Sequence, residues 1–311
     1  MRSIDVVIPN YNYGHFLEGC VRSVLNQGIA DTRILIIDNA STDDSQRIAH
    51  LLAFADPRIE LRLRTRNLGP HASFNEGVDW ARAGYFLILC ADDLLVPNAL
   101  GSAIDVMEQH PGVDLAYGEA LFLRTDEVDS RIIDPQSPVW SIEDGHSFIE
   151  RLCRFGGNPI SGPTVVVRTR AQKQAGHYNP RLAHTDDLEM WLRIAARGHV
   201  ARTRAFQAVA RVHPSNQSAS VGSLHQWNLE FEAAFVSFFE GEGAAFEDAQ
   251  KLLKMVRHSL SDRSYWSAFS SFLHREPGAW KLLMRAIQLR PTAAILPPLG
   301  HLWRKRAFMM P

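Results

Sequence analysis

The sequence predicts an α/β fold, in which a mostly parallel sheet lies between layers of helices and is followed by a helical C-terminal region. Three observations support this prediction. Strand-length apolar runs alternate with helix-length amphipathic segments over residues 1–110. Polar residues stand where several of the apolar runs end. After Ser220 the remaining segments have helical periodicity only.

The first 110 residues contain four strand-like runs, each followed by a helical segment. The expected strands are 4–9, 34–37, 59–63 and 85–90. The expected helices cover about 17–25, a segment after 41–44, 71–83 and 97–109. Ser41 to Asp44 supplies hydroxyls and carboxylates that suit the N-cap and first turn of the second helix. Repeated strand–helix units indicate a parallel sheet, so residues 1–110 are predicted to be a nucleotide-binding half.

The alternation becomes less regular in the next hundred residues, which are predicted to form an acceptor and catalytic half over 111–218. Its expected elements are a strand at 115–123, a polar segment at 126–141, a strand at 164–167, a helix at 187–197 and a strand at 209–213. A linker rich in Ser, Gly and Asn at 215–223 then leads into a helical C-terminal region, residues 219–311.

Composition excludes several classes of protein. The 311 residues are 46% hydrophobic and carry a formal charge of −1, so no basic surface for nucleic acid is expected. Three distant cysteines without CxxC spacing favour neither disulfides nor a zinc site, and fit a reducing cytoplasm. The N-terminus enters a strand directly, and no apolar run reaches the roughly 18–20 residues that span a bilayer. We therefore expect a cytoplasmic protein whose membrane contact, if present, is peripheral.

Two adjacent carboxylates, Asp92 and Asp93, follow the most hydrophobic strand-like run. Their mutual repulsion would be relieved by a divalent cation, and Mg²⁺ or Mn²⁺ bound by one or two carboxylates commonly completes its shell with phosphate oxygens. The alternative is an aspartate that caps the helix near Pro97. In the company of the other motifs, the metal site is the favoured interpretation.

Further residues at the ends of the first three strands, or just after them, are candidates for contact with a nucleotide. They are Pro9, Tyr11, Asn12, Asp38, Asn39, Ser41, Arg66, Asn67 and Gly69. Each has a structural alternative as a turn, cap or solvated loop residue. Because the carboxyl ends of parallel strands meet at one edge of a sheet, we expect these residues to gather there.

A second acidic pair, Asp186 and Asp187, precedes an amphipathic helix. The helix dipole is expected to lower the pKa of both carboxylates and keep them ionised, which suits a general base. A plain helix start explains this segment equally well. His213 closes a late strand and is a candidate ligand for metal or phosphate, with a structural histidine as the alternative.

Taken in order, these motifs resemble the family 2 glycosyltransferases of the GT-A fold over residues 3–218. The matching pieces are 7–12, 36–43, 66–69, 75–77, 91–93, 186–193 and 211–213. The resemblance implies that the first loop, Asp38 and Asn75 hold the nucleotide and that Asp92 and Asp93 carry Mn²⁺ or Mg²⁺. It assigns Asp187 as the catalytic base.

The resemblance also implies an activity: inverting transfer of a sugar, of the hexosyltransferase type, from a nucleotide-sugar to a saccharide or lipid-linked acceptor in bacterial cell-envelope polysaccharide synthesis. UDP is the expected donor nucleotide, ahead of dTDP and GDP. The chain lacks the Gln-x-x-Arg-Trp motif of processive members, which favours single additions. It has Cys90 where many members carry a further aspartate, and Asp186 where the pair often begins with Glu.

Two alternative functions make different demands on the sequence. A sugar-nucleotide pyrophosphorylase would carry a Gly-rich phosphate loop after the first strand, and this chain has 9–14, Pro-Asn-Tyr-Asn-Tyr-Gly, instead. A non-catalytic relative would keep nucleotide binding and serve as an assembly module.

The basic and aromatic segment 303–308 is predicted to contact an anionic membrane through the C-terminal helices, although a solvated helix end fits it equally well.

Overall fold

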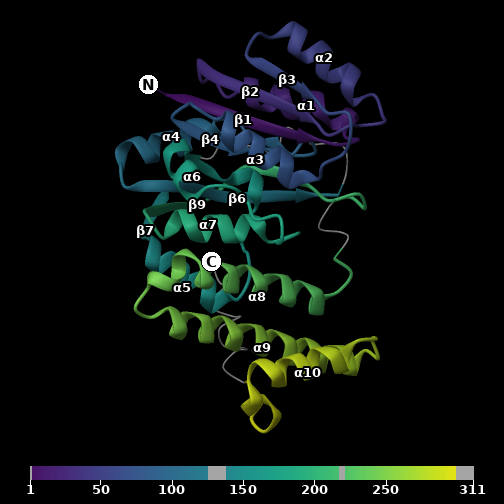
Figure 1. The fold of residues 1–311 in the computed structure, drawn as a ribbon, viewed down its shortest axis with the longest axis vertical. Coiled ribbons are helices and arrows are strands. Elements are labelled where there is room, and N and C mark those ends of the chain that lie inside the picture. Colours follow the sequence, from purple (N-terminus) through teal and green to yellow (C-terminus); the bar gives the residue numbers. More distant parts are fainter. Residues whose placement is uncertain (1, 125–137, 217–220, 299–311) are drawn as a thin grey trace. The chain divides into compact units, whose positions relative to one another are not determined.

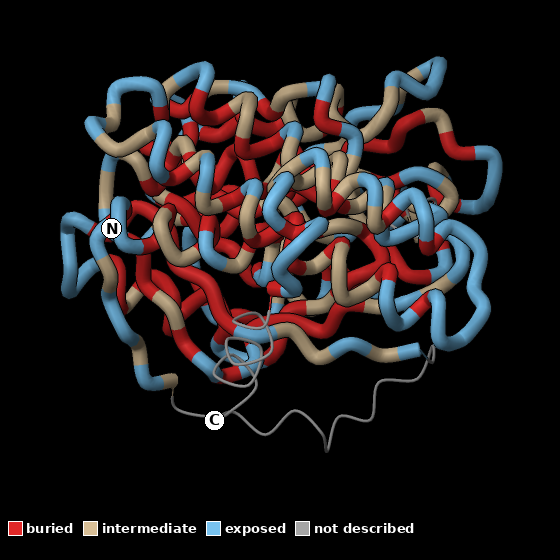
Figure 2. Tube along the Cα trace, turned by 90° about the horizontal axis from the view of Figure 1, so that it is seen from below, coloured by how far each residue is buried: buried red, intermediate tan, exposed pale blue. Residues whose placement is uncertain are grey.

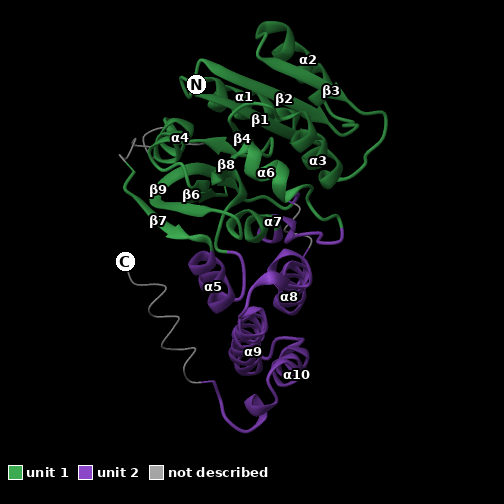
Figure 3. Ribbon diagram, turned by 60° about the vertical axis from the view of Figure 1, so that its left-hand side comes forward, with its two compact units in different colours: residues 1–145, 159–180, 190–214 green, residues 146–158, 181–189, 215–311 purple. Residues whose placement is uncertain are grey.

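The structure is a computed structural model that describes residues 2–124, 138–216 and 221–298 (Figure 1). The chain forms two compact units, which are coloured separately in Figure 3. Unit 1 comprises residues 1–145, 159–180 and 190–214, and unit 2 comprises 146–158, 181–189 and 215–311.

Unit 1 is built on a nine-stranded sheet with the order β3-β2-β1-β4-β8-β6-β9-β5, and β7 pairs with β9 as well. The strands are β1 (Ser3–Asn10), β2 (Asp31–Asp38), β3 (Ile59–Leu63), β4 (Tyr85–Ile88), β5 (Leu94–Leu95), β6 (Val113–Leu123), β7 (Trp140–Asp144), β8 (Val166–Arg168) and β9 (His199–Arg211). The pairs among β1, β2, β3 and β4 are parallel, as predicted. The sheet as a whole is mixed, because β8 and β5 run antiparallel to their neighbours.

Helices cover both faces of this sheet. They are α1 (Gly14–Leu25), α2 (Ser45–Ala55), α3 (Pro70–Trp80), α4 (Ala99–Gln109), α6 (Thr169–Ala175) and the greater part of α7 (Asp186–Ala195). Residues of α1 and α4 share a core with Ile4, Val6 and Ile8 on one face. On the other face α3 approaches β1 closely at Gly77, where an added Cβ would lie 2.7 Å from a methyl carbon of Val7. The buried positions, red in Figure 2, include most of β1 and β2.

Several element boundaries differ from the predicted ones. The second helix begins at Ser45, and the side chain of Asp44 does not cap it. Instead, Asp43 Oδ1 accepts a hydrogen bond from the Ser45 N–H over 3.0 Å. The two-residue strand β5 is absent from the prediction, since it is too short to show a period. The strand expected at 209–213 is the end of β9, which begins at His199.

Unit 2 confirms the predicted helical C-terminal region. It contains most of α5 (Gly145–Phe155), together with α8 (Leu224–Glu240), α9 (Ala249–Leu273) and α10 (Ala279–Leu289). The Ser223 hydroxyl caps α8 by accepting from the Gln226 N–H. Within the parts of the chain that the structure describes, every helix is too short or too polar to cross a bilayer. The segment 303–308, which is predicted to contact a membrane, lies outside the described residues.

Candidate active site

The carboxyl ends of β1, β2 and β3 lie together at one edge of the sheet in unit 1. In the strand register Asn10 is the partner of Asp38, and Asp38 is the partner of Leu63. The segments that leave these strands therefore start side by side. The ends of the strands and the segments that leave them carry all nine of these candidate nucleotide-contacting residues, so the expected gathering at this edge is observed.

Asp38 lies at the centre of this edge and is fully buried. Its Oδ2 accepts a hydrogen bond from Asn10 Nδ2 over 2.9 Å, and its Oδ1 accepts one from the Ser41 N–H over 3.0 Å. Gln46 Nε2 also donates to Oδ1. Both carboxylate oxygens of Asp38 are thus engaged in hydrogen bonds within the protein. These bonds join the end of β1 to the loop after β2.

Two further candidates, Asn12 and Ser41, take part in the same arrangement. The Ser41 hydroxyl accepts from the Asn12 N–H over 2.9 Å, and Asn12 Oδ1 accepts from the Thr42 N–H over 2.8 Å. Asn12 has φ of 59°, in the left-handed region, which asparagine adopts more readily than most residues. The two loops therefore form one cross-linked unit.

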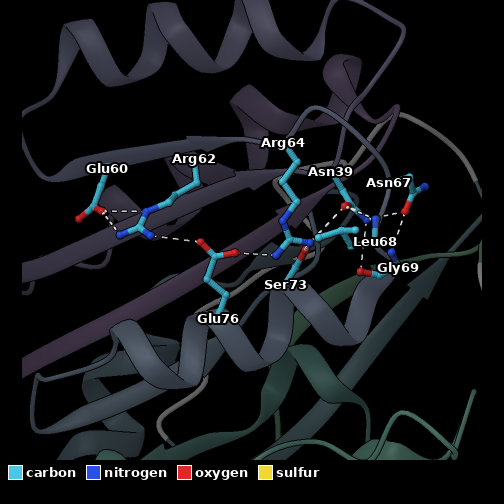
Figure 4. A network of polar contacts seen from close by, with 9 residues as sticks. All are labelled: Asn39, Glu60, Arg62, Arg64, Asn67, Leu68, Gly69, Ser73 and Glu76. Carbon is cyan, nitrogen blue, oxygen red and sulfur yellow. Dashed lines mark hydrogen bonds and ion pairs between the residues drawn. The ribbon is translucent and has the colours of Figure 1, made fainter.

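Asn39 organises the third loop, as Figure 4 shows. Its Oδ1 accepts from the Leu68 N–H and from Arg64, while its Nδ2 donates to Asn67 Oδ1 and to the Gly69 carbonyl. All four bonds lie between 2.7 and 3.2 Å. Asn39 is 5% exposed, so the turn at 66–69 is held by hydrogen bonds to a buried side chain.

A chain of ion pairs runs from β3 through Glu76 of α3 to Arg64, which bonds to Asn39. Arg64 pairs with Glu76 over 2.6 Å, and Arg62 pairs with both Glu76 and Glu60 (Figure 4). The neighbouring candidate Asn75 is used inside unit 1, because its side chain exchanges two hydrogen bonds with the backbone of Tyr178.

Other candidates at this edge are open to a ligand. Tyr11 is 43% exposed. Arg66 and Asn67 are exposed as well, and Arg66 forms no ion pair with any residue that the structure describes. Pro9 is half-buried at the end of β1, and Gly69, with φ of 80°, precedes the first turn of α3. A guanidinium and an aromatic face beside a helix N-terminus suit a nucleoside diphosphate.

The first acidic pair is positioned by the unpredicted strand β5. Its residues Leu94 and Leu95 pair antiparallel with Val209 and Ala208 of β9, which sets Asp92 and Asp93 beside the end of β9. Asp93 Oδ1 accepts from the Arg211 N–H over 3.2 Å, and the Arg211 guanidinium donates to the Asp92 carbonyl over 2.5 Å.

His213 lies at the same place. Its Nε2 is 3.2 Å from Asp92 Oδ2. The imidazole ring stacks on Phe16 with centroids 5.6 Å apart and meets Tyr13 edge-on at 5.3 Å. Burial, together with the charges of Asp92, Cys90 and Asp93, raises the pKa of Tyr13 to about 12. The phenol therefore stays protonated at neutral pH.

The acidic pair has the electrostatics of a cation site. Burial raises the pKa of Asp92 above its usual range, against the opposing effects of His213 and Arg211. The pKa of Asp93 is raised further, by burial and then by the charge of Asp92. A divalent cation would offset both the cost of burying the charged carboxylates and their mutual repulsion. Among the described residues no group of three or more His, Cys, Asp and Glu is placed to hold a metal ion.

The second acidic pair begins α7, in the part of that helix that belongs to unit 2. Asp187 Oδ1 accepts from the Leu188 N–H over 2.6 Å, and its Oδ2 accepts from Asn158 Nδ2 over 3.1 Å. Asp186 is 7% exposed and Asp187 is partly buried. The carboxylate of Asp187 is thus held in a fixed orientation from two sides.

The prediction that the helix dipole lowers the pKa of this pair is wrong. Burial and then the neighbouring charge of Asp187 raise the pKa of Asp186 to about 8. Burial also raises the pKa of Asp187 to about 6, although hydrogen bonds from Leu188 and Asn158 oppose the rise. Desolvation outweighs the dipole, and Asp187 becomes the member that ionises first.

Several residues of these sites were not among the candidates. Asn10, Gln46 and Asn158 orient the predicted carboxylates, and Arg211, Tyr13 and Phe16 surround His213. Asn10 could have been found, because it ends the first strand in register with the end of the second. Asn158 lies 29 residues before Asp187 in a segment without a period, so no sequence signal marks it.

Comparison with known proteins agrees with this architecture. The family described as Glycosyl transferase family 2 matches residues 5–131. An uncharacterized glycosyltransferase of Haemophilus influenzae is 31% identical over 186 residues, which cover 60% of this chain and 69% of the relative. The UDP-Glc:alpha-D-GlcNAc-diphosphoundecaprenol beta-1,3-glucosyltransferase WfgD of Escherichia coli is 25% identical over 231 residues, 73% of this chain and 84% of that protein.

A solved structure shares the fold. The crystal structure of S. aureus TarS 1-349 in complex with UDP-GlcNAc superposes with a TM-score of 0.67 at 15% identity, and the match covers 92% of this chain and 80% of TarS 1-349. For some other curated relatives the matched region spans only 63–64% of their length. The match to the Haemophilus protein, the family match over 5–131 and the shared fold lead to one assignment. The chain belongs to glycosyl transferase family 2.

Proposed function

We propose that this protein is an inverting glycosyltransferase of the GT-A type, which transfers a sugar from a UDP-sugar to a saccharide or lipid-linked acceptor. The observation that carries the proposal is the raised pKa of Asp187 together with the fixed orientation of its carboxylate. Its pKa is raised to about 6, and two donors fix its oxygens. A carboxylate that is ionised at neutral pH, yet more basic than an ordinary aspartate, suits a general base.

We propose that the donor nucleotide binds at the edge formed by the loops after β1, β2 and β3, within a nucleotide-binding half over residues 1–110. Tyr11 and Arg66 are exposed there and would contact the base and the diphosphate. Asp38 and Asn39 would act by positioning these loops, since their polar atoms are already bonded within the protein. The UDP-GlcNAc complex of TarS supports UDP as the nucleotide.

The residues at the first acidic pair fit a divalent cation, Mn²⁺ or Mg²⁺. Asp92 and His213 would ligate it, Asp93 would add charge from a position held by the Arg211 N–H, and diphosphate oxygens of the donor would complete the shell. When bound, such a cation neutralises negative charge on the departing nucleoside diphosphate.

The reaction proposed is a single in-line displacement. Asp187 accepts the proton of the acceptor hydroxyl as the hydroxyl oxygen attacks the anomeric carbon of the donor sugar. The bond between that carbon and the diphosphate oxygen breaks, and its electron pair leaves with the nucleoside diphosphate. Asn158 keeps Asp187 Oδ2 in place during the transfer. Attack from the side opposite the leaving group inverts the configuration of the sugar.

The acceptor is proposed to bind against residues 111–218, where the sequence departs from the repeated strand–helix pattern. The name of the WfgD relative specifies a diphosphoundecaprenol-linked sugar, which supports a lipid-linked acceptor for this chain. We propose that the protein meets such an acceptor at the cytoplasmic face of a bacterial membrane. Synthesis of a cell-envelope polysaccharide is the pathway that we propose for such an acceptor.

The proposal is tested by incubating the protein with UDP-, dTDP- and GDP-sugars, Mn²⁺ and a synthetic lipid-diphosphate-linked sugar, and determining the anomeric configuration of any product by NMR. Transfer from a UDP-sugar with inversion supports the proposal. Retention contradicts the inverting mechanism. Binding of a UDP-sugar without turnover over the whole acceptor panel would favour the non-catalytic assembly module instead.

A further inference from the structure

Unit 2 exposes a cluster of large apolar side chains where α9 ends and α10 begins. We call this cluster the apolar ridge, and its members are Phe269, Phe272, Leu273, Trp280 and Met284. Their side chains are between 41% and 68% exposed. Large apolar groups scattered singly on a surface are ordinary, whereas a contiguous group of them marks a site of interaction.

The ridge is contiguous across the turn between the two helices. The rings of Phe272 and Trp280 are 6.4 Å apart and meet at 67°. Phe269 lies one turn before Phe272 on the same helix face. Trp280 and Met284 are four residues apart and share one face of α10, while Leu282 and Ala286 of that helix are buried.

The segment after α10 carries further apolar residues of the same hairpin. The ring of Phe269 lies 6.0 Å from that of Trp266, and the Trp266 indole N–H donates to the Pro298 carbonyl over 3.0 Å. Just before that anchored carbonyl, Ile295 is 83% exposed and Leu296 is 65% exposed. The helical hairpin therefore presents apolar groups from α9, from α10 and from the segment that follows.

Basic residues outnumber acidic ones in the same hairpin. Three of the basic side chains already form ion pairs: Arg257 and Arg285 with Glu232 of α8, and Arg290 with Asp262. Residues 249–298 contain eight Lys and Arg and two Asp and Glu, a net charge of +6 in a chain whose formal total is −1. At the ridge itself, Arg275 and Lys281 form no ion pair with any residue in the described parts of the chain. Glu276 is the acidic residue of the turn, and it accepts a hydrogen bond from the Ser271 hydroxyl.

We propose that the apolar ridge docks on an anionic lipid surface, with Trp280, Phe272 and Leu273 entering the headgroup boundary and Arg275 and Lys281 facing lipid phosphates. Aromatic and aliphatic side chains flanked by basic residues are the chemistry that binds at such an interface. This site is distinct from segment 303–308, and it goes beyond the transferase activity proposed above.

Charge argues against two other occupants of the ridge. A second copy of the chain would bring its own Arg275 and Lys281 against the same two cations of the first. Residues 299–311 carry Arg304, Lys305 and Arg306 and no acidic residue, so they would also meet like charge on the hairpin. A phosphate-bearing membrane supplies the opposite charge and an apolar layer together.

The test is co-sedimentation of the full chain with vesicles of phosphatidylcholine alone and of phosphatidylcholine with about 40% phosphatidylglycerol, because anionic headgroups attract basic segments. Wild type should bind the anionic vesicles and bind the neutral ones at least about tenfold more weakly. The double variant Leu273→Glu with Trp280→Glu should lose about tenfold or more in affinity for anionic vesicles.

A matched control is Phe54→Glu, because Phe54 is 94% exposed on α2 in unit 1 and receives the same kind of charge. It should bind vesicles as wild type does. Circular dichroism on each variant checks that it folds, and Lys281→Glu, which keeps every apolar group, should also weaken anionic binding.

Three results would overturn the proposal. In the first, wild type stays in the supernatant with both vesicles. In the second, the double variant binds unchanged while Trp303→Ser with Phe308→Ser abolishes binding, which would assign the contact to the C-terminal segment. In the third, light scattering shows a dimer that the double variant converts to a monomer, so that a second copy covers the ridge. Vesicle binding is measured without a sugar donor. Its result therefore tests the membrane proposal independently of the transferase activity.

Discussion

Asn10 Nδ2 donates a hydrogen bond to Asp38 Oδ2 over 2.9 Å, and the two residues are register partners at the ends of β1 and β2. The bond is buried, and it joins the two loops that leave these strands. Asp38 therefore contributes to the candidate nucleotide site by determining the shape of its edge.

Replacing Asp38 by alanine should lower the free energy of unfolding by about 1–3 kcal/mol, because the Ser41 N–H and Gln46 Nε2 lose a buried acceptor. Urea denaturation measures this change. The matched control is Asp44→Ala, since Asp44 is exposed and pairs with Arg47 on the surface, where such pairs contribute little. Equal stabilities for the two variants would show that Asp38 has no organising role.

Asn39 offers a second comparison inside one network. Asn39→Ala removes four hydrogen bonds that hold the turn at 66–69, and we expect a loss of about 1–3 kcal/mol in stability and roughly tenfold weaker binding of UDP. Asn67→Ala removes two bonds from an exposed residue and should cost less than about 1 kcal/mol by the same reasoning. Calorimetry of UDP binding measures both variants, and a larger effect from Asn67→Ala would mean that Asn67 itself contacts the nucleotide.

Removal of the proposed cation should act through the first acidic pair. With EDTA, or in the Asp92→Ala variant with Mn²⁺ present, affinity for UDP should fall about 10- to 100-fold, a loss as large as the one in metal affinity or activity when residues around a metal site are replaced. Asp31→Ala serves as control, because Asp31 is exposed at the opposite end of β2. Tight binding of UDP in EDTA that is indifferent to Asp92→Ala would remove the metal from the mechanism.

Much of the fold follows from local patterns. The strand at 59–63 matches its predicted bounds to the residue, and the helices α1, α3 and α4 match to within a few residues, because each apolar run or face is long enough to show its period. The edge of the sheet is also predictable, since parallel strands must end together.

The features of the candidate site that could not be predicted from the sequence depend on contacts between residues far apart in the chain. The short strand β5 places Asp92 beside His213 only through its pairing with Val209 and Ala208, more than a hundred residues away. The predicted direction of the pKa of Asp187 is wrong for the same reason. Its desolvation depends on neighbours brought by the fold, whereas the helix dipole could be inferred from the segment alone.

A further prediction concerns Asp187 as the base. Asp187→Asn keeps the size of the side chain and one of its two acceptor oxygens but cannot accept a proton, so kcat should fall ~100-fold or more while the KM for the donor changes little. Asp186→Asn is the matched control. The pKa of Asp186 is raised to about 8, so its carboxyl is mostly protonated at neutral pH, and a neutral amide should alter turnover only slightly. The reverse order of effects would transfer the role to Asp186.

The pH dependence of the rate provides a separate check on the same residue. Asp187 must be ionised to accept a proton, and its pKa is raised to about 6, so the rate should be constant above that pH and fall about tenfold per unit below it. An ordinary aspartate would place this limb near about pH 4. Initial rates of the wild type between about pH 5 and 8 measure the limb, and the residual activity of Asp187→Asn should lack it. A limb that persists in this variant would belong to another group, because the amide does not titrate in this range.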